Sequence, residues 1–566
     1  MPKSLLALAA ALLASTAASP KTLIDNVNGI QVGADGEIEH FRALVIGDDG
    51  KVASTIGQHV LADVDAQHRI DMGGKTLLPG LIDAHGHVLD SPGGGPGLGL
   101  VLLQLDLTGT RSIADLQQRL KAHAAANPGG GWITGRGWNQ ELWPDKRFPT
   151  AADLDAVVAD RPVWLTRVDG HAAAGNSAAL KTAGIGAGMA DPAGGRIERG
   201  ADGRPTGLFI DNAIGLVADK IPPTTPQTMD RALDAAQAAL LANGLTAVTD
   251  MGTSLAGWQA MHRAGEAGHL KMRLIAYADG LEAARAITAK QPVLWVHGDR
   301  LRLTGVKLYA DGALGSRGAW LKRPYADMPD SHGLRFLSDS ELRAQADEVS
   351  ARGHQIAVHA IGDAANAQVI SAFEDMSRKW GPKRRWRIEH VQVIDPADIP
   401  RMAKAGIIAS MQPTHQTSDR LMAEKRLDPL RLEGAYAWRT IEQSGALLAF
   451  GSDFPVESPN PFPGLAAAVS RQDPNGQPPG GWRPGEKVSL ATALAGFTRN
   501  AAYAGFAESR IGSLERGKWA DFIIVDRDPT KVDAHALAAT QVLETWVAGE
   551  KAYEKPASGA PGERAR

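Results

Sequence analysis

The sequence predicts an α/β fold: a (β/α)8 TIM barrel, a small β-sandwich built from both ends of the chain, and a large insertion after the first barrel strand. Three observations lead to this prediction. Apolar strand-like runs alternate with helical stretches through the middle of the chain, a pattern typical of a parallel sheet wrapped by helices. There are eight such runs, the number that closes a barrel. Short β-rich segments stand at both ends.

The eight runs lie within residues 77–507, which we take as the barrel. They are Leu77–His87, Thr246–Gly252, Met272–Ala278, Leu303–Gly312, Gln355–Ala360, Trp386–His390, Ile407–Gln412 and Leu447–Asp453. The gap after the first run, residues 91–240, is too long for one connection and needs structure of its own. Because it follows the first barrel strand, we expect it to lie over the active face as a lid or pocket wall.

The two ends of the chain, residues 20–76 and 508–553, are expected to form one small sandwich. Strand-like segments such as Ala43–Ile46 and Asp521–Asp526 are separated by turn signals such as Asp48-Asp-Gly50. Residues 554–566 are rich in Pro, Gly, Ala and Arg, a composition that predicts a disordered tail.

The first 19 residues have the order of a secretory signal peptide. Lys3 precedes an almost unbroken Leu/Ala run from Leu5 to Leu13, and small residues follow up to Ser19. The run is too short for a permanent membrane anchor. We therefore expect a periplasmic or secreted protein with no stable anchor after cleavage.

Composition limits the partners and the metal ligands. The 566 residues include 60 Lys+Arg and 63 Asp+Glu, a formal charge of -3 that gives no polycation for nucleic acid. A small-molecule substrate without strong charge is the expectation, and a homo-oligomer is left open. There is no cysteine, so any metal must be held by His, carboxylate or a modified Lys.

Candidate metal ligands recur where the predicted barrel strands end. His85 and His87 follow a buried-type run and alternate by two, so both side chains leave the strand on one face. Lys307, His359, His390 and Asp453 stand in or at the ends of later runs. Because the carboxyl ends of barrel strands converge, these groups predict one site for Zn²⁺ or a similar divalent metal. Glu389, next to His390, is expected on the opposite face of its strand and is left out of the ligand set.

The ordered motifs resemble the metal-dependent amidohydrolase superfamily, in the branch that includes the N-substituted formamide deformylases (amidohydrolase family 3). The resemblance spans nearly the whole mature chain. The matching motifs are Pro79-Gly-Leu-Ile-Asp-Ala-His-Gly-His87, Val306-Lys-Leu-Tyr-Ala-Asp-Gly312, Val358-His-Ala-Ile-Gly-Asp363, Arg387-Ile-Glu-His390, Gly451-Ser-Asp-Phe-Pro455 and the Gly512–Asp526 segment.

This resemblance implies a site with two metal ions. His85, His87 and Asp453 would bind one ion, and His359 and His390 the other. Lys307 would bridge them as a carbamate formed with CO₂, because a bare ammonium would repel two dications. The alternative is an unmodified Lys307 paired with Asp311, which leaves a site for one ion.

The expected reaction is hydrolysis of a non-peptide carbon–nitrogen bond in an amide, formamide or cyclic amide. Asp453 is the predicted catalytic residue, accepting a proton from the attacking water and passing it to the departing amine. Two alternatives remain: an ester or lactone hydrolase on the same scaffold, and a non-catalytic periplasmic binding or regulatory protein.

Three further residues are substrate candidates. His171 lies in the inserted region, in a segment that lines the substrate pocket of the resembling branch. His415 follows the seventh predicted strand and so faces the active end of the barrel. Arg317 could orient a substrate, although arginine is more often a solvated surface residue.

Overall fold

The computed structural model describes residues 22–57, 66–91, 95–167, 170, 172–192, 195–288 and 290–557. The expected signal peptide, residues 1–19, and most of the expected tail lie outside these ranges. Within them, no helix combines the length and the apolar character needed to cross a membrane. By its contacts the chain divides into two units, residues 1–86, 238–255 and 265–566 in one and residues 87–237 and 256–264 in the other.

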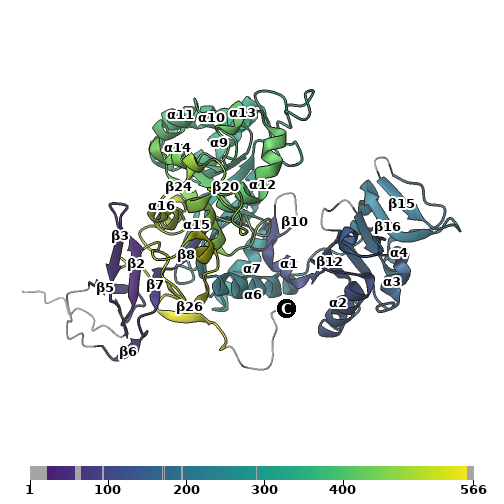
Figure 1. The fold of residues 1–566 in the computed structure, drawn as a ribbon, viewed down its shortest axis with the longest axis horizontal. Coiled ribbons are helices and arrows are strands. Elements are labelled where there is room, and N and C mark those ends of the chain that lie inside the picture. The colour runs from purple at the N-terminus through teal and green to yellow at the C-terminus, as the bar shows by residue number, and fades with distance from the viewer. Residues whose placement is uncertain are drawn as a thin grey trace, which may run out of the picture. The chain divides into compact units, whose positions relative to one another are not determined.

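Eight parallel strands in the described part of the first unit form the barrel, which confirms the predicted fold class (Figure 1). Their order around the sheet is β24, β23, β22, β21, β20, β18, β17 and β8. Their bounds are β8 (Leu81–Gly86), β17 (Leu245–Thr253), β18 (Arg273–Asp279), β20 (Leu301–Tyr309), β21 (Gln355–Ala360), β22 (Arg387–His390), β23 (Ile408–Met411) and β24 (Leu448–Phe450). Each of the eight predicted runs overlaps one of these strands.

Side chains and loop backbone close the barrel between its first and last strands. The Asp83 carboxylate in β8 accepts hydrogen bonds from the Ser452 hydroxyl at 2.6 Å and the Ser452 amide at 3.1 Å. The Asp453 amide donates to the His85 carbonyl at 2.7 Å. The segment after β24 is therefore attached to β8 at the end of the barrel that carries the candidate ligands.

Helices connect the barrel strands. The first turn of α9 has a capping box, in which Ser338 and Glu341 each accept a backbone N–H of the other. A proline at the first helical position starts both α12 and α15. The helices between barrel strands from β18 onward are α8 (Gly280–Ile287), α9 (Asp339–Ala351), α10 (Asp363–Trp380), α11 (Ile399–Lys404), α12 (Pro413–Arg426), α13 (Pro429–Leu432) and α14 (Trp438–Gln443). The helices α15 (Pro461–Ser470), α16 (Leu490–Gly496) and α17 (Arg499–Ala504) follow the last barrel strand, and α18 (Ala534–Ala538) lies between β25 and β26.

Both ends of the chain build the predicted sandwich. One sheet has the order β5-β4-β1-β6, and the other has the order β27-β26-β25-β7-β2-β3, so purple and yellow strands lie side by side in Figure 1. A shared core joins Leu44 of the first sheet to Leu77 and Phe522 of the second. The strands are β1 (Thr22–Asp25), β2 (Asn28–Val32), β3 (Ile38–Phe41), β4 (Ala43–Ile46), β5 (Val52–Ile56), β6 (His68–Asp71), β7 (Thr76–Pro79), β25 (Phe522–Val525), β26 (Val542–Val547) and β27 (Glu550–Glu554).

The structure divides the first predicted barrel strand, Leu77–His87, at Gly80. Residues before it form β7 of the sandwich, and residues after it form β8 of the barrel. A Cβ at position 80 would lie 2.2 Å from the Thr246 hydroxyl oxygen, so only glycine fits at this close approach. The sequence does not show where one strand ends and the next begins, because both strands are buried and form one continuous apolar run.

The second unit contains the predicted insertion and has a sheet with the order β11-β12-β13-β14-β16-β15. In this sheet β12 pairs in parallel with both β11 and β13, and the other neighbouring strands pair antiparallel. Two apolar cores form in this unit, one around Trp138 and Trp143 and the other around Trp164 and Phe209. The strands are β11 (Leu105–Asp106), β12 (Ile133–Trp138), β13 (Val163–Arg167), β14 (Ala172–Gly175), β15 (Gly195–Arg199) and β16 (Pro205–Asp211).

Its helices include α1 (Leu98–Leu103), α2 (Ile113–Ala126), α3 (Ala151–Asp155), α4 (Ser177–Ala183) and α5 (Gly215–Ala218). Two more helices, α6 (Pro226–Ala242) and α7 (Leu255–Glu266), contain residues of both units.

Candidate metal centre

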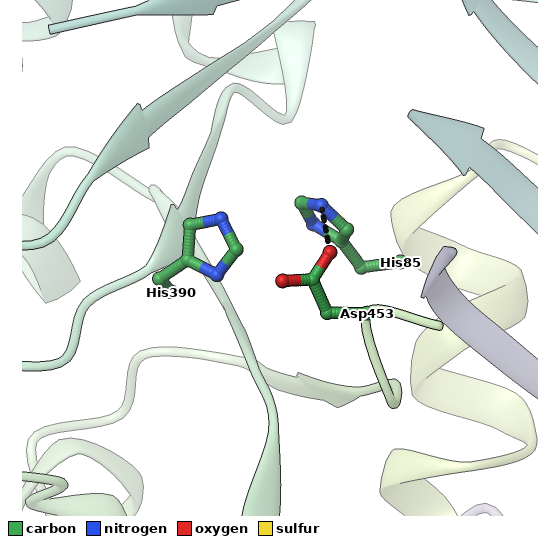
Figure 2. A group of neighbouring side chains, drawn as sticks. All are labelled: His85, His390 and Asp453. Carbon is green, nitrogen blue, oxygen red and sulfur yellow. Dashed lines mark ion pairs between the residues drawn. The ribbon is translucent and has the colours of Figure 1, made fainter. Parts of the chain in front are cut away.

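Three side chains from separate strand ends point toward one another in the barrel (Figure 2). His85 lies in β8, His390 is the last residue of β22, and Asp453 follows β24 by three residues. All three are buried, and one ligand atom of each lies within 4.8 Å of the others. The His85 Nε2 atom is 3.4 Å from the Asp453 Oδ1 atom. Among the described residues, this is the cluster of histidine and carboxylate atoms spaced to hold a metal ion.

Other predicted residues surround this cluster. The Nζ atom of Lys307, in β20, is 3.2 Å from the Nε2 atom of His85. The ring of His359, in β21, lies 4.7 Å from that of His390 between centroids. His415, near the start of α12, stacks on His390 at 6.0 Å. The barrel therefore brings His85, Lys307, His359, His390, His415 and Asp453 to one place.

Burial favours the uncharged forms of the two imidazoles of His85 and His359 and of the Lys307 amine. It lowers the pKa of His85 to about 4 and that of His359 to about 3, with the Lys307 ammonium as the next largest cause in both cases. Burial also lowers the pKa of Lys307 to about 8. Neutral imidazoles keep the lone pair that metal coordination requires.

The donor set fits a divalent metal. Nε2 of His359 and Nε2 of His415 are buried and have no hydrogen-bond partner among the described residues. Carboxylate oxygens approach both atoms without hydrogen bonding, Asp311 Oδ1 at 3.4 Å from His359 and Asp453 Oδ2 at 3.6 Å from His415. Imidazole and carboxylate are the ligands from which zinc sites without cysteine are built.

Both imidazoles of the cluster, those of His85 and His390, have a hydrogen-bond partner at their Nδ1 atom. The Nδ1 atom of His85 lies 2.6 Å from a Glu389 carboxylate oxygen. The Nδ1 atom of His390 lies 2.9 Å from the Gln412 side-chain oxygen. Glu389 and Gln412 were not predicted from the sequence. Its spacing from Arg387 is the signal that could have identified Glu389. Charged residues are rarely buried unless they are paired, so two opposite charges two positions apart in a buried strand indicate an ion pair inside the barrel.

Asp311, the alternative ion-pair partner of Lys307, makes its hydrogen bonds to backbone amides. The Asp311 carboxylate accepts the amide hydrogens of Ile361, Gly362 and Trp320 at 2.8 to 2.9 Å. It thereby fastens the loop after β21, next to His359.

Three predicted residues remain to be placed, Arg317, His171 and His87. Arg317 binds Asp327 at 2.9 Å with its side chain about one third exposed. His171 lies outside the described residues. His87 belongs to the second unit, where it is buried and its carbonyl accepts the amide hydrogen of Leu98 at 2.8 Å.

Comparisons with known proteins connect this geometry to a family. Residues 69–553 match the family described as "Amidohydrolase family". Protein LONG AFTER FAR-RED 3 of Arabidopsis thaliana is 33% identical over 528 residues, 91% of this chain and 88% of the relative. The N-substituted formamide deformylase of Arthrobacter pascens is 29% identical over 509 residues, 86% of this chain and 90% of the relative.

A solved structure agrees with these matches. An uncharacterized metal-dependent hydrolase from Pyrococcus horikoshii superimposes with a TM-score of 0.74 at 27% identity. The superposition covers 91% of this chain and 99% of that protein.

Proposed function

We propose that this chain, which belongs to the amidohydrolase family, cleaves small non-peptide amides, with formamides as the first candidates. It is a hydrolase acting on carbon–nitrogen bonds. The observation that carries the proposal is the buried cluster of His85, His390 and Asp453, whose ligand atoms lie within 4.8 Å of one another. The similarity to a protein named as a formamide deformylase supports the choice of substrate class.

The metal would be held by imidazole and carboxylate ligands. His85 and Asp453 would serve one ion, and His359 and His390 a second ion where two are bound. Zn²⁺ is the first candidate for this ligand set. When bound, a divalent metal supplies activation of a water molecule and polarisation of the scissile carbonyl.

Lys307 supports a site that can take two ions. Its pKa of about 8, lowered by burial, leaves a larger neutral fraction of the amine near pH 7 than an exposed lysine has. The neutral amine is the form that combines with CO₂. Carboxylation would turn a cation that repels metals into an anionic ligand.

Asp453 would move the proton during hydrolysis. One of its oxygens faces Nε2 of His85 at 3.4 Å, and the other faces Nε2 of His415 at 3.6 Å. In this position the carboxylate can accept the proton of the attacking water and deliver it to the departing amine nitrogen. His415, whose Nδ1 atom contacts the Gln392 amide at 3.1 Å, would orient the carboxylate or the substrate.

The test combines metal analysis with a substrate panel. Purified full-length protein is supplemented with Zn²⁺, and bound metal is counted per chain. Turnover is then compared on N-formyl amines, N-acetyl amines, cyclic amides and matched esters. We expect at least about one ion per chain and faster hydrolysis of amides, formamides above all.

Asp453→Asn is the control variant. It keeps the side-chain volume but removes the proton acceptor and a charged ligand, so kcat should fall by a factor of about 10² or more. A protein that binds no metal after supplementation would refute the proposal. So would one that hydrolyses the esters and leaves every amide intact.

A further inference from the structure

A buried row of three side chains runs from the barrel interior to the metal centre. Both carboxylate oxygens of Glu389 accept from the Arg387 guanidinium, at 2.7 and 3.0 Å. The Oε2 atom of Glu389 also lies 2.6 Å from Nδ1 of His85. All three residues are fully buried.

The charge on Glu389 decides which nitrogen of His85 carries a hydrogen. An ionised carboxylate only accepts hydrogen bonds, and the contact with a guanidinium on both oxygens keeps Glu389 ionised. The Nδ1 atom of His85 must therefore be the donor. Its Nε2 atom is left with the lone pair, and this is the atom that faces Lys307 and Asp453.

Arg387 fixes the position of the carboxylate as well as its charge. The guanidinium also donates to the Ala84 carbonyl at 2.7 Å and the Ser410 hydroxyl at 2.8 Å. It is thereby anchored to β8, the strand that carries His85, and to β23. Glu389 therefore cannot rotate away from His85 without breaking its hydrogen bonds to Arg387.

We propose that Glu389, held by Arg387, is a positioning residue that orients His85 and sets its tautomer for metal binding. This inference rests on the proposed function, because it assumes that His85 is a metal ligand. Outer partners of metal-binding histidines commonly change metal affinity about 10- to 100-fold when they are removed. An effect of that size is expected here.

A second ion pair of the same kind provides a matched control. Arg273 binds both carboxylate oxygens of Asp521 at 2.7 and 2.8 Å, and both residues are buried. The carboxylate of Asp521 also accepts the Ala548 amide, in the sandwich. Breaking this pair disturbs a buried charge to a similar degree without touching His85.

The experiment measures how Zn²⁺ partitions between the metal-loaded full-length protein and a competing chelator. Wild type, Glu389→Gln and Asp521→Asn are compared, with thermal unfolding recorded for each. The Glu389 variant should bind Zn²⁺ about 10- to 100-fold more weakly. The Asp521 variant should bind like wild type even though its melting temperature falls.

Glu389→Asp is the second variant if Glu389→Gln does not fold. It keeps the negative charge beside Arg387 but draws the carboxylate back from His85, so it should also weaken Zn²⁺ binding. Wild-type affinity in the Glu389 variants, or equal weakening in Asp521→Asn, would refute the positioning role alone. A wild-type protein that binds no Zn²⁺ would refute the proposed function together with it.

Discussion

Two residues of the metal centre have a backbone conformation that side chains other than glycine rarely adopt. The φ angles of His390 and Asp453 are 78° and 61°, and Val391 follows with 44°. Left-handed backbone at non-glycine residues costs free energy and collects at functional sites. The strands end here with a turn of the chain that aims the side chains into the cluster.

His354 leads to a pH prediction at the scale of a single residue. Burial, with the charge of Arg352 second, lowers its pKa from 6.5 to about 4 in the folded protein. Below pH 6.5 His354 binds a proton in the unfolded chain but stays neutral in the folded one, so the free energy of unfolding falls as the pH drops from 6.5 toward 4. Urea unfolding at pH 7 and pH 5 should show this loss.

His354→Leu is the comparison for that measurement. Leucine does not titrate, so the variant should lose less stability than wild type between the two pH values. Equal losses in the two proteins would show that His354 does not contribute to the pH dependence.

The site could be predicted from the sequence as far as strand ends define it. His85, Lys307, His359, His390 and Asp453 were placed by the convergence of barrel strands, and the structure gathers them. Partners that depend on side-chain direction were missed. The alternation of side chains in a strand predicted that Glu389 and His390 point to opposite faces. However, His390 ends its strand with a positive φ, so its side chain joins the metal cluster while Glu389 contacts His85.

At the scale of elements, the contact between β8 and the segment after β24 is the point on which the barrel depends. Gly451 lies in this contact. A Cβ there would be 2.4 Å from an Asp83 carboxylate oxygen and 2.6 Å from the His85 amide nitrogen. Neither atom can move freely, because Asp83 is buried and hydrogen-bonded to Ser452.

Gly451→Ala should therefore loosen the barrel at this contact. Overpacking of this kind costs about 1 to 3 kcal/mol of unfolding free energy. We expect lower stability in urea and less bound metal per chain, since His85 and Asp453 lie on either side of the contact. Gly485→Ala is the control, because a Cβ at that position meets nothing within 4 Å. Equal stability of the two variants would contradict the prediction.

Element positions were predicted better than element boundaries. All eight barrel strands were found because each is a buried apolar run between helical stretches. The break at Gly80 was missed, since the same apolar run serves two sheets, β7 through its first half and β8 through its second. A run of apolar residues predicts that a strand is buried, but it does not show which sheet the strand joins.

At the scale of the whole molecule, one buried ion pair joins the barrel to the sandwich. Arg273 begins β18, and Asp521 precedes β25. The Trp519 ring lies 4.9 Å from the Arg273 guanidinium and completes the contact. Removing one charge of such a pair leaves the other buried without compensation.

Asp521→Asn should lower the unfolding free energy by about 3 kcal/mol, measured by urea unfolding. Glu348→Gln is the control, since it breaks a contact with Arg285 that is partly exposed and screened by solvent. A loss no greater than that of the control would show that the buried pair contributes little to stability.

The joining of the two ends of the chain was predicted, whereas the fold of the insertion was not. Short strands at both ends have few ways to cover their apolar faces other than each other. The insertion mixes parallel and antiparallel strand pairs and places helices between only some of its strands, so no regular alternation indicates their order.

The sheet shared by the two ends has a consequence for how the chain folds. β7, which leads directly into the strand carrying His85, pairs with β25, so Pro79 meets Phe522. During synthesis on the ribosome, β7 must wait for a partner strand that is made only after all eight barrel strands. The pairing joins segments that are far apart in the sequence, and non-local contacts of this kind slow folding.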